Sequence, residues 1–126
     1  MLRIATILNA KYEFDVNQPV AEVYGFPKEK MDAIGCSIGE VLDGGGPWTD
    51  RDRVILRLID EQLATYDNEP ETVKDALKLL SVEEIVEVLM MIGIYALLAR
   101  VIKGLRVDDD QPIPDLKDKI RTAITS

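Results

Sequence analysis

The longest uncharged stretch of the chain runs from Val88 to Ala99 and is closed by Glu87 and Arg100. Its twelve residues are too few to cross a bilayer, which needs about 20. They are typical of a helix that is buried nearly all round, because a surface helix shows polar residues at every third or fourth position. We therefore expect this stretch to form the core and an oligomer interface.

Local signals bound this helix on both sides. Ser81 and Glu84 have the spacing of a capping box, which predicts a helix start at Val82. Gly104 fits the left-handed position that follows a helix end. The pattern therefore predicts a central helix over residues 82–103.

The rest of the pattern is also helical. A second strong helix is expected over residues 49–66, where Thr49 followed by Asp52 indicates a cap and apolar residues recur at helical spacing. Shorter helices are expected over residues 1–10, 12–24, 28–34, 36–42, 70–80 and 116–124. The glycine run after Asp43 predicts a connector, because it lacks the Lys and Ser/Thr of a phosphate-binding loop. No strand signal appears, so the predicted class is all-α.

Composition narrows the class of protein without naming it. The chain has 126 residues, enough for one domain. Its net charge of −8 argues against nucleic acid and against anionic membranes as partners. One cysteine allows no intrachain disulfide, and the first residues lack the pattern of a signal peptide, so we expect a cytoplasmic protein.

The absence of histidine restricts the chemistry most strongly. The sequence contains none, so the usual acid/base group at neutral pH is missing. Histidine-containing zinc and non-haem iron sites are excluded, and we expect neither a metal nor another cofactor. Proton transfer would fall to Asp, Glu, Tyr, Lys or the single Cys.

Two blocks of the sequence resemble a known family. The first is residues 2–34, LRIATILNAKYEFDVNQPVAEVYGFPKEKMDAI, and the second is residues 48–107, with SVEE at 81–84 and GIYALLAR at 93–100. In order and spacing they are similar to the carboxymuconolactone decarboxylase and alkylhydroperoxidase-D-like proteins. The resemblance implies one antiparallel helical domain over residues 1–126, with residues 105–126 as a C-terminal extension. It also implies assembly as dimers, trimers or hexamers, with a pocket between helices near a subunit boundary.

The chain departs from the peroxidase branch of that family. The branch uses a Cys-x-x-Cys-x-x-x-His motif, and the matching places hold Ala10, Glu13 and Asn17. A disulfide cycle needs two thiols with Cα atoms within about 7 Å, so thiol peroxidase activity is not expected. Asn17 also cannot titrate where the histidine of the decarboxylase branch would.

Five residues are candidates for a functional site. The resemblance places Tyr12, Glu13 and Asn17 in the family's pocket, and Glu13 and Asn17 would share a helix face. A Glu buried beside a Tyr would have a raised pKa and could act as general acid or base. Asn17 could donate a hydrogen bond to a carbonyl or enolate oxygen. The alternative places Glu13 and Asn17 in solvent. Trp48 and Tyr95 could line a substrate pocket, although a staple on the next helix and core packing explain them as well.

The function expected from the resemblance is cofactor-independent acid/base chemistry on a small organic acid, lactone or polyketide-like substrate. The reaction would be a decarboxylation, isomerisation or cyclisation, with Glu13 as proton carrier, Tyr12 orienting it and Asn17 stabilising an oxyanion. A second hypothesis is a non-catalytic oligomer that binds or supports other molecules. A third is a fragment whose missing first helix carries the essential acid.

Overall fold

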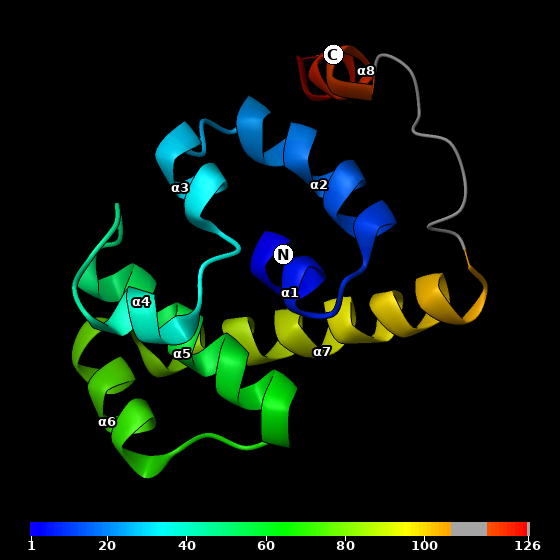
Figure 1. Ribbon diagram of the computed structural model, residues 1–126. Coiled ribbons are helices and arrows are strands. Elements are labelled where there is room, and N and C mark those ends of the chain that lie inside the picture. The colour runs from blue at the N-terminus through cyan, green and yellow to red at the C-terminus, as the bar shows by residue number, and fades with distance from the viewer. Residues whose placement is uncertain (107–115, 126) are drawn as a thin grey trace.

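The computed structural model describes residues 1–106 and 116–125, and the chain is all-helical over these ranges (Figure 1). The helices are α1 (Leu2–Ile7), α2 (Lys11–Val23), α3 (Lys28–Ala33), α4 (Ile38–Leu42), α5 (Asp50–Thr65), α6 (Pro70–Leu79), α7 (Val82–Gly104) and α8 (Leu116–Thr125). No strand occurs in the described ranges, which confirms the predicted all-α class. The acidic run and the prolines between α7 and α8 lie outside the described residues.

The two strongest helix starts are where the sequence predicts them. Thr49 caps α5 together with Asp52, and Ser81 caps α7 together with Glu84. In each pair the hydroxyl oxygen accepts from the third backbone N–H of the helix, while the carboxylate accepts from the N–H of the capping residue. Each capping box thereby gives partners to two backbone N–H groups that have none inside the helix.

The predicted end of the central helix is wrong in its detail. Gly104 is the last residue of α7 and does not form the left-handed position. That conformation falls on Arg106, with a φ of 59°. The apolar run before Gly104 continues the helix through the glycine, since a single Gly weakens a helix but does not end it.

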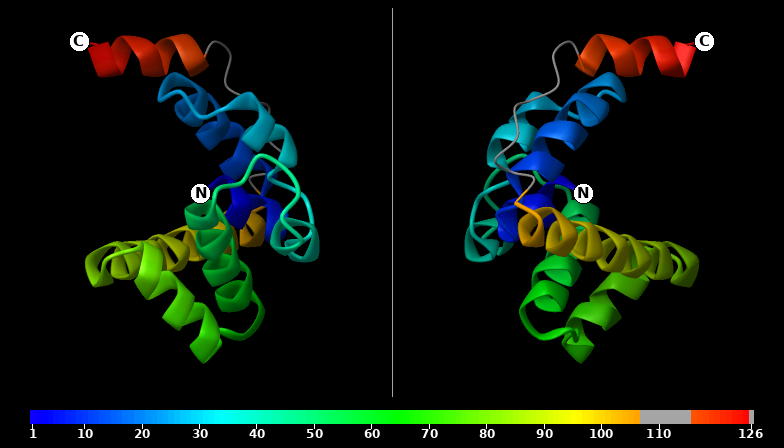
Figure 2. Two further views of the ribbon diagram at one scale, coloured as in Figure 1. Left: turned by 90° about the vertical axis from the view of Figure 1, so that its left-hand side faces the viewer. Right: turned by 90° about the vertical axis from the view of Figure 1, so that its right-hand side faces the viewer.

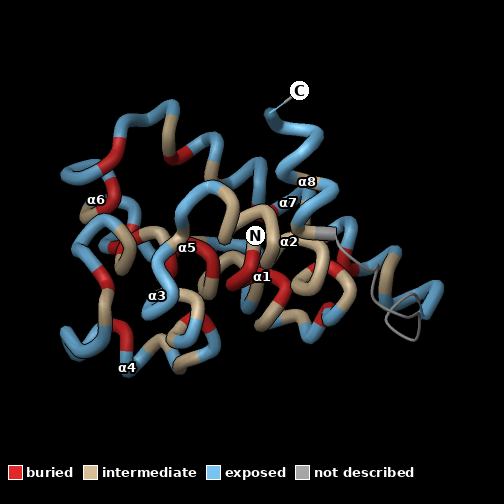
Figure 3. The backbone as a smooth tube through the Cα atoms, turned by 90° about the horizontal axis from the view of Figure 1, so that it is seen from above, coloured by how far each residue is buried: buried red, intermediate tan, exposed pale blue. Residues whose placement is uncertain are grey.

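Helices α1 and α5 form the centre of the fold. Helix α1 packs against α2, α5 and α7, and α5 packs against α1, α4, α6 and α7. Buried segments accordingly gather around α1 and α5 (Figure 3). Helix α8 packs against α2 and lies away from α5, α6 and α7 (Figure 2).

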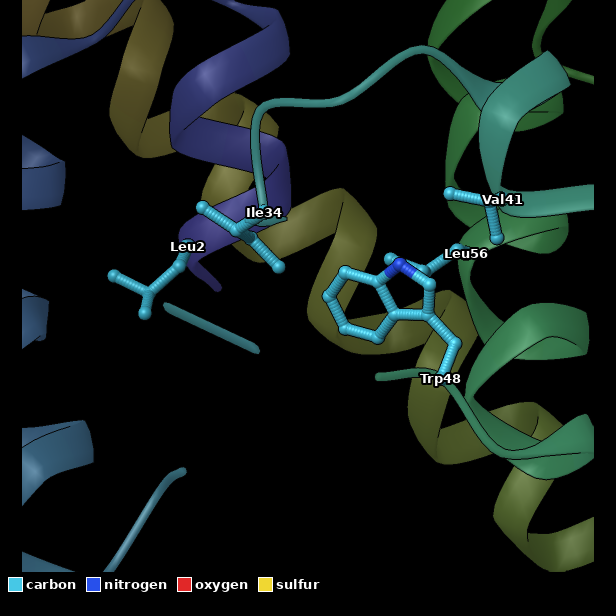
Figure 4. Packing of buried hydrophobic residues seen from close by; sticks show 5 residues of the cluster. All are labelled: Leu2, Ile34, Val41, Trp48 and Leu56. Carbon is cyan, nitrogen blue, oxygen red and sulfur yellow. The ribbon is translucent and has the colours of Figure 1, made fainter. Parts of the chain in front are cut away.

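Three clusters of buried side chains fill the space between these helices. One joins α1, α4 and α5 through Leu2, Ile34, Val41, Trp48 and Leu56 (Figure 4). Another joins α5, α6 and α7 through Val54, Leu58, Ala76, Leu80 and Ile85. The third joins α1, α5 and α7 through Ile4, Ile59 and Ile92.

The prediction that the central helix is buried nearly all round is wrong for a single chain. Only Ile85, Ile92 and Ala99 of α7 are buried. Among the described residues α1, α2, α5 and α6 cover one side of α7, and its opposite side carries large apolar residues that face solvent. By length and composition alone, α7 is also long and apolar enough to cross a membrane, and 11% of its most apolar part is buried.

Candidate functional site

Glu13 lies inside the fold, in the first turn of α2. Its side chain is only 3% exposed, so the alternative that places Glu13 in solvent is wrong. The chain reverses direction between α1 and α2 at Asn9, which has a φ of 52°, and this reversal folds α2 back onto α1. On the outside of α2, Lys11 forms an ion pair with Asp15. Glu13 is therefore the carboxylate that the first turn of α2 turns inward.

Met1 connects Glu13 with Tyr95. Burial lowers the pKa of the Met1 amino group, while the negative charge of Glu13 acts in the opposite direction. The Tyr95 hydroxyl of α7 donates a hydrogen bond to the Met1 Sδ at 2.6 Å. Two of the predicted site residues, which are far apart in the sequence, thus both interact with Met1, at the start of α1. Sequence reasoning did not identify Met1.

Trp48 belongs to the hydrophobic core and also borders a cavity. Its indole packs against Leu56, with Ile34 and Val41 on either side (Figure 4). With Met1, Trp48 lines a mainly apolar cavity of about 210 Å³ between α1, α2 and α5. Trp48 thus contacts Leu56 of α5 and, in the same cluster, residues of α1 and α4. Met1 contributes both to this cavity and to the contact with Tyr95.

Asn17 and Tyr12 are less well placed for chemistry than Glu13. The Asn17 Nδ2 donates to the backbone carbonyl oxygen of Glu13 at 2.7 Å, so the amide is engaged along its own helix. Tyr12 and Asn17 are both half-buried. Neither they nor Glu13 line the 210 Å³ cavity. Of the three α2 residues, Glu13 alone combines full burial with an ionisable group.

A buried arginine near this junction was also missed by sequence reasoning. The Arg3 guanidinium binds the Asp60 carboxylate through two hydrogen bonds of 3.0 and 2.7 Å. It also donates to the carbonyl oxygens of Ile34 and Cys36. A single charge within the apolar stretch from Leu2 to Leu8 was the signal available in the sequence, because a buried charge needs a partner. This arrangement ties α1 to α5 and to the α3–α4 connection.

Glu61, a residue that the family resemblance also covers, belongs to a structural network between α5 and α6. It accepts hydrogen bonds from the hydroxyl of buried Thr72 and from the backbone N–H of Glu69. Burial alone would raise the pKa of Glu61, but the hydrogen bonds from Thr72, Glu69 and Asn68 and the charge of Arg57 together lower it. A carboxylate held in its charged form by so many donors is suited to fixing the α5–α6 loop.

A larger groove lies between α5 and α7. Its volume is about 580 Å³, and most of its lining is apolar. Two cations stand at one end: Arg100 donates to the Tyr66 hydroxyl at 3.1 Å, and Lys103 donates to the carbonyl oxygen of Leu8 at 3.1 Å. Within residues 1–106 and 116–125, no cluster of three potential metal ligands occurs.

Comparison of the chain with protein-family models, with curated proteins and with solved structures found no significant match. The described structure is that of an all-α protein in which the carboxylate of Glu13 is buried where α2 packs on α1.

Proposed function

We propose that the protein is a divergent, oligomeric member of the carboxymuconolactone decarboxylase-like group that acts on small organic molecules by acid/base chemistry. The reaction class is decarboxylation, isomerisation or cyclisation of an organic acid, lactone or polyketide-like compound, without metal or redox cofactor. The observation that carries this proposal is the burial of Glu13, which is 3% exposed. In a chain without histidine, a buried carboxyl group is the strongest available candidate for proton transfer.

The proposed division of roles follows from the surroundings of each residue. Glu13 carries the proton. Tyr95 donates to Met1, whose amino group is within reach of the charge of Glu13, so Tyr95 is proposed to hold Met1 in place. The Asn17 amide keeps a second N–H beyond the one bound to the backbone, and this N–H is the donor proposed for a developing oxyanion. Tyr12 precedes Glu13 on the same turn and is proposed to orient the substrate or the acid.

The test has a binding step and a turnover step. The protein is screened by thermal shift against lactones, cyclic keto acids and polyphenolic carboxylates, since a ligand at 100 times its Kd stabilises the folded state by about 2.7 kcal/mol. Compounds that bind are then assayed for turnover. Glu13→Gln should abolish turnover and leave binding largely intact, because it removes the proton and keeps the shape of the side chain.

Asp15→Asn is the matched control, because Asp15 lies half a turn away on the outside of α2 and pairs with Lys11. It should retain full turnover. Unchanged turnover in Glu13→Gln would remove Glu13 from the mechanism.

A second candidate function is a non-catalytic oligomer that binds small molecules. The hydrogen bond from Asn17 to its own helix favours it, as do the two cavities, which Glu13, Tyr12 and Asn17 do not line. Compounds that bind without any turnover, equally in the wild type and in Glu13→Gln, would support this candidate over the first.

A further inference from the structure

The outward side of α7 carries a regular apolar seam. Met90, Ile94, Leu97 and Val101 are 61%, 52%, 61% and 49% exposed. They follow one another at alternating spacings of four and three residues. This is the spacing by which one helix presents a continuous row of side chains to a second helix in a coiled coil. Folding of a single chain leaves this row in solvent.

The exposed area is close to what a stable interface requires. The exposed large apolar residues on or beside this face are Val86, Leu89, Met90, Met91, Ile94, Leu97, Leu98, Val101 and Leu105. Side chains of this size at half exposure present about 80 Å² each, which gives on the order of 700 Å² for the face. The largest apolar patch of a monomer is about 300–600 Å², whereas each partner in a stable protein interface buries about 800 Å².

The carboxylates near the start of α7 favour one orientation of a second copy. Glu83 and Glu87 continue the seam toward the helix start, whereas Arg100 and Lys103 near the helix end lie off the seam and donate to Tyr66 and Leu8. Two parallel copies would bring Glu83 and Glu87 against their own equivalents. Two antiparallel copies instead place these carboxylates at opposite ends of the interface, so that they do not repel one another.

A bilayer fits the same face less well. Helix α7 as a whole is long and apolar enough to span a bilayer. However, only the stretch from Val88 to Ala99, about 18 Å long, is free of charge, so charged side chains would enter a hydrocarbon core of about 30 Å. The other side of α7 packs against α1 and α5, and the chain as a whole carries a net charge of −8.

We propose that two copies of this chain associate through α7 in antiparallel orientation. Ile94 of one copy faces Leu97 of the other, and Met90 faces Val101. This inference specifies the oligomer of the proposed function. It does not involve Glu13, so the interface and the acid/base chemistry can fail independently.

The first experiment measures the mass of the full-length chain by sedimentation equilibrium. The wild type should form a particle of at least twice the 14.1 kDa chain. Leu97→Glu should at least halve the particle mass and preserve the helical circular dichroism, because Leu97 is 61% exposed and only borders the α5–α7 groove. Leu77→Glu on α6 is the matched control, since Leu77 is similarly exposed at 51% and lies off the seam. An assembly unchanged by Leu97→Glu overturns the proposal.

The second experiment tests the orientation by oxidative cross-linking. Met90→Cys and Val101→Cys should form a disulfide between chains when the two variants are mixed, and neither should do so alone. Equivalent residues at position 90 would lie about 16 Å apart along an antiparallel pair, well beyond the roughly 7 Å limit for a disulfide. The wild type, with Cys36 alone, is the control.

Three results contradict the proposal. A cross-link formed by Met90→Cys alone indicates parallel pairing. A mixture that gives no cross-link removes the proposed contact. A wild type that is monomeric in solution and sediments with phosphatidylcholine vesicles assigns the face to a membrane.

Discussion

Replacing Arg3 by Met would remove the buried ion pair while keeping most of the packing around the side chain. Methionine keeps the apolar stem of the side chain and removes the guanidinium that binds Asp60 and the carbonyl oxygens of Ile34 and Cys36. The Arg3 side chain is 6% exposed and that of Asp60 is 19% exposed. Asp60 would therefore lose its counter-charge in a setting that water reaches only in part.

The expected cost follows from that burial. Removing one partner of a buried ion pair costs about 3–5 kcal/mol, because the other charge stays buried without compensation. The residual exposure of Asp60 favours the lower end, so we expect a loss of about 3 kcal/mol. For a denaturant slope of about 1.5 kcal/mol per M, the urea midpoint would fall by roughly 2 M.

The assay is urea unfolding followed by circular dichroism and by Trp48 fluorescence. Trp48 is the only tryptophan and packs in the same cluster as Leu2 and Ile34, so its emission reports on the region around Arg3. Arg51→Met is the control, because the Arg51–Glu84 pair is exposed and such pairs contribute about 0–1 kcal/mol. An Arg3→Met loss no larger than that of the control would refute the assigned importance of the buried pair.

Three further predictions concern other parts of the chain. Ser81→Ala should cost about 1 kcal/mol in urea unfolding, because it removes the hydroxyl from the cap of α7. Glu61→Gln should be less stable than the wild type at neutral pH. Because the folded-state pKa of Glu61 lies below its ordinary value of 4.5, this advantage of the wild type is present above that value and should shrink as the pH falls below it. Gly46→Ala should destabilise by about 1 kcal/mol or more and shift the Trp48 emission, since Gly46 has a φ of 79° and an added Cβ would lie 3.2 Å from the indole.

The helix starts could be predicted because they depend on residues close together in the sequence. The capping pairs Thr49–Asp52 and Ser81–Glu84 fix the first turns of α5 and α7 through hydrogen bonds spanning three residues. The end of α7 was predicted less well. Glycine permits a left-handed conformation without requiring it, and α7 continues through Gly104.

Burial could not be predicted in the same way, since it depends on which elements meet. Glu13 follows Tyr12 in a mixed pattern that suits either a solvated or an inward position, and only the packing of α2 on α1 decides between them. The apolar run of α7 indicated a helix covered on all sides. Other helices of the chain cover only one side of α7, and the apolar residues on its other side remain exposed in a single chain.

One side of α7 contributes to the proposed site and the opposite side forms the proposed interface, so the two proposals can be tested separately. Tyr95 lies on the inner side and donates to Met1, whereas Leu97, two residues later, is 61% exposed at the edge of the α5–α7 groove. Because residues two apart on a helix do not face the same way, a charge at position 97 acts on the pairing of two chains and leaves the Met1 contact in place. Activity retained in a monomeric Leu97→Glu variant would place the chemistry within one subunit. Activity lost together with the dimer, with the fold intact, would mean that the second copy of α7 completes the site.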